Sequence, residues 1–125
     1  MKRQMRTIKF RFWQPSTRTM QKWEDYQQYG IFEMFNNVDS IPLQFTGLTD
    51  KNGVEIYEGD ILTYKRSVGN WTGQFITTTH KIVFSDEVFA FVMKYGTSYI
   101  KLRKHWGYEY EIVGNIYQNE HFLNT

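Results

Sequence analysis

The sequence predicts a mostly β protein, a small barrel-like or sandwich domain of six to eight short antiparallel strands that ends in a short helical turn. Val, Ile, Thr, Tyr, Phe and Trp account for 52 of the 125 residues, whereas Ala and Leu, which a helix bundle needs, number only six. Several segments alternate apolar and polar residues, and Gly, Asn, Asp and Pro interrupt the chain between them. The length fits one domain, so we expect residues 1–125 to form a single unit.

The first expected strand covers residues 6–13, where apolar side chains alternate with basic ones. A period of two places one set of side chains on the core and the other set on the opposite face. Pro15 ends this strand, and residues 20–23 are expected to return beside it as a hairpin. Residues 24–40 show no clean period and predict an irregular loop or a short strand. The expected core set is Ile8, Phe10 and Phe12, and the opposite set is Lys9, Arg11 and Trp13.

Turn signals organise the middle of the chain. A short strand is expected at residues 43–46, followed by the turn Asp50–Gly53, whose Asn-Gly pair tolerates the positive φ of tight turns. Residues 54–56 lead into a second turn at Glu58–Asp60, and a further strand starts at residues 61–64. We therefore expect a corner built from two turns.

The second half of the chain predicts a long strand at residues 74–84 that meets residues 88–93 across a three-residue loop, the pattern of a hairpin. One face of the long strand is expected to carry Ile76, Thr78, His80, Ile82 and Phe84. Further strands are expected at residues 99–102 and 108–113, with Ile116 and Tyr117 finishing the sheet and residues 119–123 forming one closing helical turn.

Few residues suggest catalysis or metal binding. The chain has no cysteine, which excludes disulfides, thiolate metal sites and thiol catalysis. Glu58 and Asp60 could serve a carboxylate-dependent hydrolase, but Asp60 beside Gly59 is typical of a turn whose side chain accepts backbone N–H bonds. The three histidines show no metal-ligand spacing. We expect no catalytic residues, no metal and no cofactor, and we retain the hydrolase as an alternative.

Charge is distributed unevenly along the chain. Residues 1–23 form a basic arm with seven basic and no acidic side chains, whereas the remainder has a net charge of −5. Such an arm is typical of a surface that meets nucleic acid or the acidic body of a neighbouring subunit, and a solvated arm has the same pattern. No secretory signal and no membrane-spanning apolar run are visible. We therefore expect a cytoplasmic protein with neither a membrane nor a small-molecule partner.

Two groups of residues are candidates for partner surfaces. Positive charge beside flat aromatic rings is the combination that follows a phosphate backbone and stacks bases. The nucleic-acid candidates are Arg6, Lys9, Arg11, Trp13, Lys101, Arg103, Lys104 and Trp106. The chain also has 23 aromatic residues, more than a small barrel encloses, so some are expected at an interface between copies. The candidates for that interface are Tyr26, Tyr29, Phe32, Met34 and Phe35.

Three sequence blocks together span nearly the whole chain. They read RTIKFRFW at residues 6–13, LQFTGLTDKNGVEIYEGDIL at 43–62 and EIVGNIYQN at 111–119. In the order and separation of these blocks the chain resembles the YopX-like proteins of bacteriophages and prophages. The resemblance implies a mostly β, barrel-like fold, a phage or prophage origin in a bacterial host cell and homo-oligomers, and it implies no catalytic residue. The chain departs from the family at residues 119–121, Asn-Glu-His in place of Asn-Pro-Glu, and in its denser basic head.

Together, these features predict a phage-encoded, oligomeric protein that acts by binding rather than by catalysis. An accessory protein that binds nucleic acid through the basic and aromatic residues is the alternative hypothesis. The order of the oligomer and the identity of its partner stay open at this point.

Overall fold

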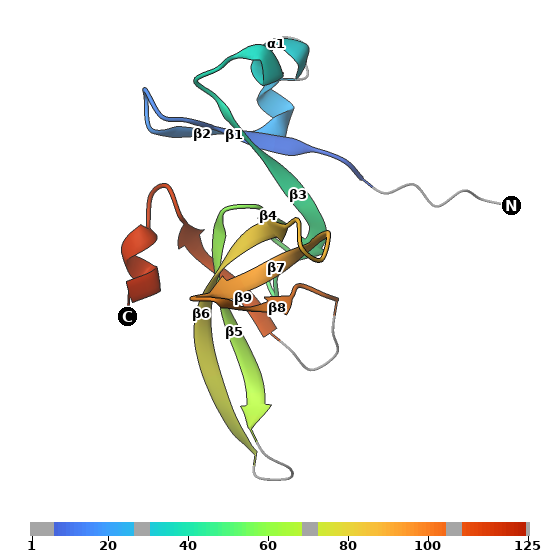
Figure 1. Ribbon diagram of the computed structural model, residues 1–125, viewed down its shortest axis with the longest axis vertical. Coiled ribbons are helices and arrows are strands. Elements are labelled where there is room, and N and C mark those ends of the chain that lie inside the picture. Colours follow the sequence, from blue (N-terminus) through green and yellow to red (C-terminus); the bar gives the residue numbers. More distant parts are fainter. Residues whose placement is uncertain (1–6, 27–30, 69–72, 105–108, 125) are drawn as a thin grey trace, which may run out of the picture.

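The computed structural model describes residues 7–26, 31–68, 73–104 and 109–124. These residues form two antiparallel sheets, which confirms the predicted mostly β fold (Figure 1). The smaller sheet has the order β2-β1-β3-β4, and the larger sheet, curled into half a barrel, has the order β8-β7-β6-β5-β9. The strands are β1 (Phe10–Gln14), β2 (Thr19–Gln21), β3 (Ile41–Thr49), β4 (Glu55–Tyr57), β5 (Asp60–Val68), β6 (Gln74–Ser85), β7 (Ala90–Tyr95), β8 (Ser98–Lys101) and β9 (Glu109–Asn115).

The N-terminal hairpin forms as expected, with Trp13 of β1 opposite Met20 of β2. β1 also pairs with β3, so β1 is an inner strand of the smaller sheet. Between β2 and β3 the chain forms the 3₁₀ helix η1 (Trp23–Tyr26) and the helix α1 (Ile31–Asn36). The prediction of an irregular loop or short strand is wrong here, because helices of one or two turns are too short to show an apolar period in the sequence.

β3 and β4 form the corner that joins the two sheets. Phe45 lies opposite Tyr57, and an irregularity shifts the register between this pair and the end of β3. The turn predicted around Gly53 is present, and Gly53 has a φ of 80°. The second predicted turn also forms, where Gly59 has a φ of 84° and a Cβ atom would lie 3.2 Å from the Tyr117 ring. A side chain at Gly59 would therefore meet both backbone strain and a packed neighbour.

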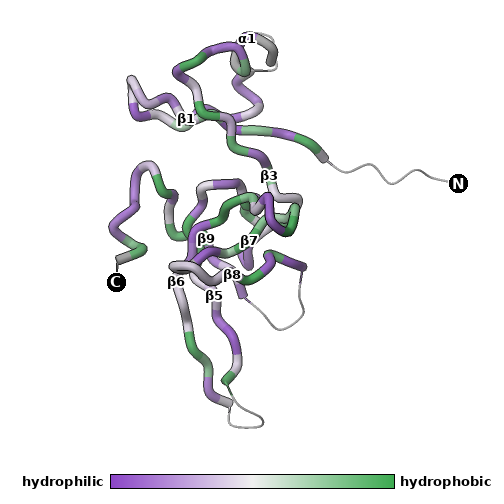
Figure 2. The backbone as a smooth tube through the Cα atoms, in the orientation of Figure 1, coloured by the Kyte–Doolittle hydropathy of each residue, from purple (hydrophilic) through white to green (hydrophobic). Residues whose placement is uncertain are grey.

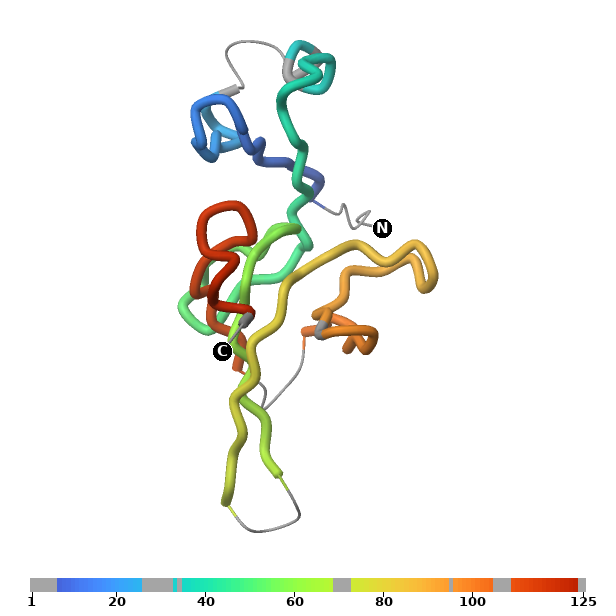
Figure 3. The backbone as a smooth tube through the Cα atoms, turned by 60° about the vertical axis from the view of Figure 1, so that its left-hand side comes forward, coloured from blue at the N-terminus to red at the C-terminus, as the bar shows by residue number. Residues whose placement is uncertain are grey.

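The β5–β6 hairpin runs along the larger sheet and continues beyond it. Its two strands pair from Ile61 and Lys81 to Val68 and Gln74. Figures 1 and 3 view it from two directions, and in both the far end projects away from the other strands. The predicted inner face of β6 is buried only in its middle, because the core extends neither to the projecting end at Ile76 nor to the opposite end at Phe84. His80 and Ile82 are buried, whereas Ile76 and Phe84 are 38% and 48% exposed.

Several strand bounds differ from the prediction, and those of β7 and β9 have a visible cause. β7 begins at Ala90 rather than two residues earlier, because Phe89 adopts a φ of 52° and ends a longer turn. β9 ends at Asn115, whose side-chain oxygen accepts the backbone N–H groups of Tyr117 and Gln118 and so turns the chain out of the sheet. The predicted closing helical turn is confirmed as the 3₁₀ helix η2 at residues 120–124.

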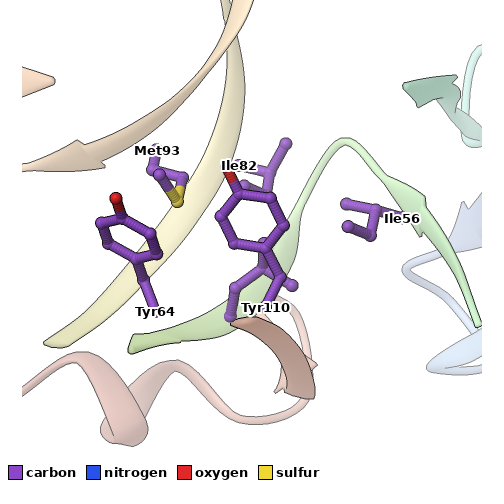
Figure 4. Packing of buried hydrophobic residues seen from close by; sticks show 6 residues of the cluster. Ile56, Tyr64, Ile82, Met93 and Tyr110 are labelled. Atoms are coloured by element: carbon purple, nitrogen blue, oxygen red, sulfur yellow. The ribbon is translucent and has the colours of Figure 1, made fainter. Parts of the chain in front are cut away.

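One hydrophobic cluster joins the corner to the larger sheet (Figure 4). Ile56 of β4 contributes a fully buried side chain. The other members come from β5, β6, β7 and β9, and they are Leu62, Tyr64, Ile82, Met93 and Tyr110. No helix among the described residues has the length and apolarity needed to cross a membrane.

Candidate functional site

A buried ion pair fixes β1 against the start of β5. Asp60 is 2% exposed, and its Oδ1 accepts a hydrogen bond of 2.5 Å from Arg11 Nη2. Its Oδ2 accepts the backbone N–H of Tyr57 at 2.8 Å, as the turn prediction for Asp60 requires. The Arg11 guanidinium also lies 4.8 Å from the centre of the Tyr57 ring. Both oxygens of this carboxyl group therefore have partners within the protein.

Burial at this site perturbs the pKa of Asp60 and the pKa of Tyr57. Burial raises the pKa of Asp60, and the Arg11 charge and the Tyr57 N–H oppose the rise. Burial also raises the pKa of Tyr57 to about 12, with Glu55 adding to the shift. In an unknown protein such shifts can mark a catalytic group. Here the contacts around Asp60 hold a turn and a strand in place.

Two other acidic side chains of the corner, Asp50 and Glu58, also bind backbone groups. Asp50 is 7% exposed, and its Oδ1 accepts the N–H groups of Asn52 and Val54 at 2.9 Å each. Its Oδ2 accepts the N–H of Ile112 in β9 at 3.1 Å. Glu58 Oε1 accepts the N–H of Gln44 at 2.9 Å. Among the described residues no group of three His, Asp or Glu side chains could hold a metal ion.

The N-terminal nucleic-acid candidates contact other parts of the protein. Lys9 forms an ion pair with Glu55 and lies 5.0 Å from the centre of the Phe45 ring. Trp13 is 4% exposed and stacks on Tyr117, with the ring centres 5.2 Å apart and the planes at 20°. Lys9, Arg11 and Trp13 therefore do not form an open basic and aromatic face. Arg6 lies outside the described residues.

The burial of side chains on the two faces of β1 differs from the sequence expectation. Phe12 is fully buried as predicted, but Ile8 precedes the strand and is 58% exposed. Trp13, on the opposite face, is buried because Tyr117 covers it. Both faces of β1 thus carry buried side chains, which the alternating pattern alone does not reveal.

The second group of basic candidates is exposed. Lys101 ends β8, and Arg103 and Lys104 follow it. Lys101 lies opposite Val92, so it shares a face of the larger sheet with Lys94 two residues further along β7. Trp106 lies outside the described residues.

The structure adds residues to this group that the sequence did not single out. Lys81 of β6, Lys94 of β7 and Tyr99 of β8 are aligned directly across three strands. Further along β6 on the same face, Phe75 has Lys65 Nζ 4.7 Å from its ring centre. We call this surface the outer face, and its members are Lys65, Phe75, Lys81, Lys94, Tyr99 and Lys101. The alternation in β6 was visible in the sequence, but the register that aligns the three strands was not.

Of the five predicted interface residues, only Phe35 has a side chain in the described part of the structure. Phe35 is 44% exposed, and its ring packs edge-on against Phe10 and Phe12 at centre distances of 4.9 and 5.3 Å. Tyr26, Phe32 and Met34 belong to η1 and α1, and their side chains lie outside the described part of the structure, as does residue Tyr29.

Several exposed apolar side chains also lie on the larger sheet. Val68, Phe75 and Ile76 are 39%, 55% and 38% exposed on the projecting end of the β5–β6 hairpin. Each arm of the hairpin carries a hydrophobic stretch in Figure 2. At the other end of β6, Phe89 is 78% exposed and lines a cavity of 460 Å³ between β3 and β7 together with Leu102.

Comparisons with known proteins agree with this fold. Residues 9–124 match the model of a family described as YopX protein. The crystal structure of protein EF1440 from Enterococcus faecalis is similar, with a TM-score of 0.61 and 22% sequence identity over 94% of this chain and 98% of that chain. This likeness is one of fold. None of the curated proteins matches the sequence.

Proposed function

This chain belongs to the YopX protein family, and we propose that it is a non-catalytic binding module that self-associates through exposed apolar side chains of its larger sheet. The proposal includes the phage or prophage origin and the cytoplasmic location suggested by the sequence blocks described above.

The observation that carries this proposal is the exposure of large apolar side chains on the β5–β6 hairpin. Val68, Phe75 and Ile76 sit at the projecting end, where no core covers them. Val68 and Ile76 share one face of the hairpin and Phe75 lies on the other face, so apolar side chains are exposed on both faces of this end, and such exposed apolar surface on a small protein is typical of an interaction site. The carboxyl groups of Asp50, Asp60 and Glu58 meanwhile bind backbone or guanidinium groups, which supports a structural rather than a catalytic role for them.

Light scattering of the purified protein at low and high salt tests the proposal. Apolar association is weakly screened by salt, so we expect a mass above the 15.1 kDa of one chain at both salt concentrations. A mass of one chain at every protein concentration would contradict self-association. An assembly that dissociates at high salt would assign the association to charge rather than to apolar contact.

Nucleic-acid binding by the outer face is a second candidate function. The alignment of Lys81, Lys94 and Tyr99 across three strands favours it, because cations beside an exposed ring suit a single strand of nucleic acid. We expect the affinity for a single-stranded oligonucleotide to fall steeply with salt and to weaken in a Lys81→Gln/Lys94→Gln variant. Lys22→Gln, at an exposed position directly after β2, is the control. Binding that responds neither to salt nor to the double substitution would contradict this function.

A further inference from the structure

The free edge of β6 offers a specific surface for self-association. We infer that residues 75–79 of β6 pair antiparallel with the same residues of a second copy, across a two-fold axis at Thr77. This inference rests on the proposed function, because it names the surface through which the copies would associate. The resulting contact would extend the larger sheet continuously from one copy into the next.

The strand pairing leaves this edge available. β5 pairs with one side of β6 along its whole projecting part, from Lys81 to Gln74. β7 pairs with the other side only from Lys81 to Ser85. Within the described residues, therefore, no strand covers the second side of β6 between Phe75 and Thr79. A strand edge of this kind presents backbone N–H and C=O groups that another strand can pair with.

The composition of the edge favours pairing. Residues 75–79 read Phe-Ile-Thr-Thr-Thr, with high β-propensity and without charge, Pro or Gly. Proteins that protect an exposed edge use charged residues, Pro, bulges or very short strands. In this stretch β6 has no charged residue and no Pro. Its register with β5 is regular, which excludes a bulge, and the strand is 12 residues long.

The other edges of the larger sheet differ from this one. β8 is only four residues long and carries Lys101, which discourages pairing. β9 is covered by the turn after β3, because Lys51 N–H donates to the Tyr110 carbonyl and Asp50 accepts the Ile112 N–H. The free edge of β6 is therefore the edge of this sheet best suited to receive a further strand.

A second copy of this chain fits the edge by symmetry. A two-fold axis at Thr77 sets Phe75 opposite Thr79 and Ile76 opposite Thr78 in the partner strand. No charged residues oppose each other within this stretch, so the pairing avoids the repulsion that directly opposed like charges cause. The side chains of Phe75 and Ile76, 55% and 38% exposed in one copy, would each gain a cross-strand threonine neighbour.

A single introduced cysteine tests the pairing directly, because the natural chain has none. In the proposed dimer the two copies of residue 77 face each other at a Cα separation of about 4.5–5.5 Å, within the range that a disulfide spans. Thr77→Cys should therefore form disulfide-linked dimers under mild oxidation. We expect the linkage to form about tenfold or more faster than in the control Asp86→Cys, because pairing raises the effective concentration of the thiols. Asp86 is exposed in the β6–β7 turn.

A charged substitution at the same position provides the second measurement. Thr77→Lys would place two ammonium groups opposite each other, so we expect light scattering to give a smaller assembly than for the wild type. Asp86→Lys is the matched control and should leave the mass unchanged. Circular dichroism establishes that each variant is folded, and the cysteine experiment decides the question if Thr77→Lys does not fold.

The outcomes separate the two proposals. An assembled wild type whose mass is unaffected by Thr77→Lys, and whose Thr77→Cys variant links no faster than the control, would overturn the β6 pairing and leave self-association intact. A wild type with the mass of one chain would overturn both. Fast linkage at residue 77 in an assembled protein is the result that the inference requires.

Discussion

At the residue scale, the buried pair of Arg11 and Asp60 joins segments 49 residues apart in the sequence. An acidic residue next to Gly59 indicated a turn, and the Tyr57 N–H bond agrees with that interpretation. The partner Arg11 could not be predicted, because nothing in the sequence brings the first strand beside the second turn. Burying two charges costs free energy of solvation, and their mutual contact offsets part of it.

Asp60→Asn should therefore destabilise the protein strongly. The amide can still accept the Tyr57 N–H, but it leaves the Arg11 guanidinium buried without a counter-charge. We expect the free energy of unfolding to fall by about 3–5 kcal/mol, the usual range when one partner of a buried ion pair is removed. Urea denaturation measures the change. Asp86→Asn, in an exposed turn, is the control, and an Asp60→Asn variant as stable as this control would contradict the structural role of Asp60.

His80 predicts a pH dependence of stability. Burial lowers its pKa below the ordinary 6.5, and the positive charge of Arg66 lowers it further. The unfolded chain therefore binds a proton near pH 6.5 that the folded protein does not, so the stability contribution is complete above that value and is lost as the pH falls through it. We expect the stability of the wild type relative to His80→Gln to decline on acidification from neutral pH. A difference that stays constant below pH 6.5 would contradict this prediction.

At the element scale, the turn after β3 connects the smaller sheet to the larger one. The Asp50 carboxylate binds two N–H groups of its own turn and the N–H of Ile112 in β9. The sequence predicted the turn from Asn52-Gly53, because local residues determine it. The contact with β9 could not be predicted, because it depends on where a strand 62 residues later is placed.

Asp50→Ala should loosen this connection. It removes the acceptor of three backbone N–H groups, so we expect a loss of about 2–3 kcal/mol in the free energy of unfolding. The Ile112 amide should also exchange its hydrogen faster, because the Asp50 carboxylate is its acceptor in the structure. Hydrogen exchange followed by NMR measures both the site and the size of the effect. Asp86→Ala is the control, and unchanged protection at Ile112 would argue against the connection.

Elements also differ in how far the sequence specifies them. β3, β5 and β6 were predictable because alternating residues and turn signals coincide there, whereas the three residues of β4 were expected only as a connection between two turns. α1 and η1 were not, since one or two turns show no period. Among the candidate residues, Lys101, Arg103 and Lys104 are exposed as a binding surface requires. Trp13 is not exposed, because the covering Tyr117 belongs to the far end of the chain.

At the scale of the whole molecule, Ile56 links the corner to the larger sheet. Its side chain is fully buried in the cluster formed by residues of β5, β6, β7 and β9. The sequence predicted one domain from length alone. Because elements of both sheets contribute to this core, we expect that neither sheet can lose its packing without affecting the other.

Ile56→Ala should consequently weaken both sheets together. We expect a loss of about 2–5 kcal/mol, as for other large-to-small substitutions in a protein core. Unfolding followed by tryptophan fluorescence and by far-UV circular dichroism should show one transition with a common, lowered midpoint. Val54→Ala, at a 52% exposed position nearby, should change the midpoint little. Two separate transitions would mean that the sheets unfold independently.

The stacking of Tyr117 on Trp13 has a consequence for the synthesis of the protein. Ribosomes make β1 long before Tyr117, so the Trp13 indole ring stays uncovered until Tyr117 has emerged. Gly59 packs against the same tyrosine, so the corner is also completed late. The nascent chain must therefore carry an open apolar surface until the segment that contains Tyr117 closes it.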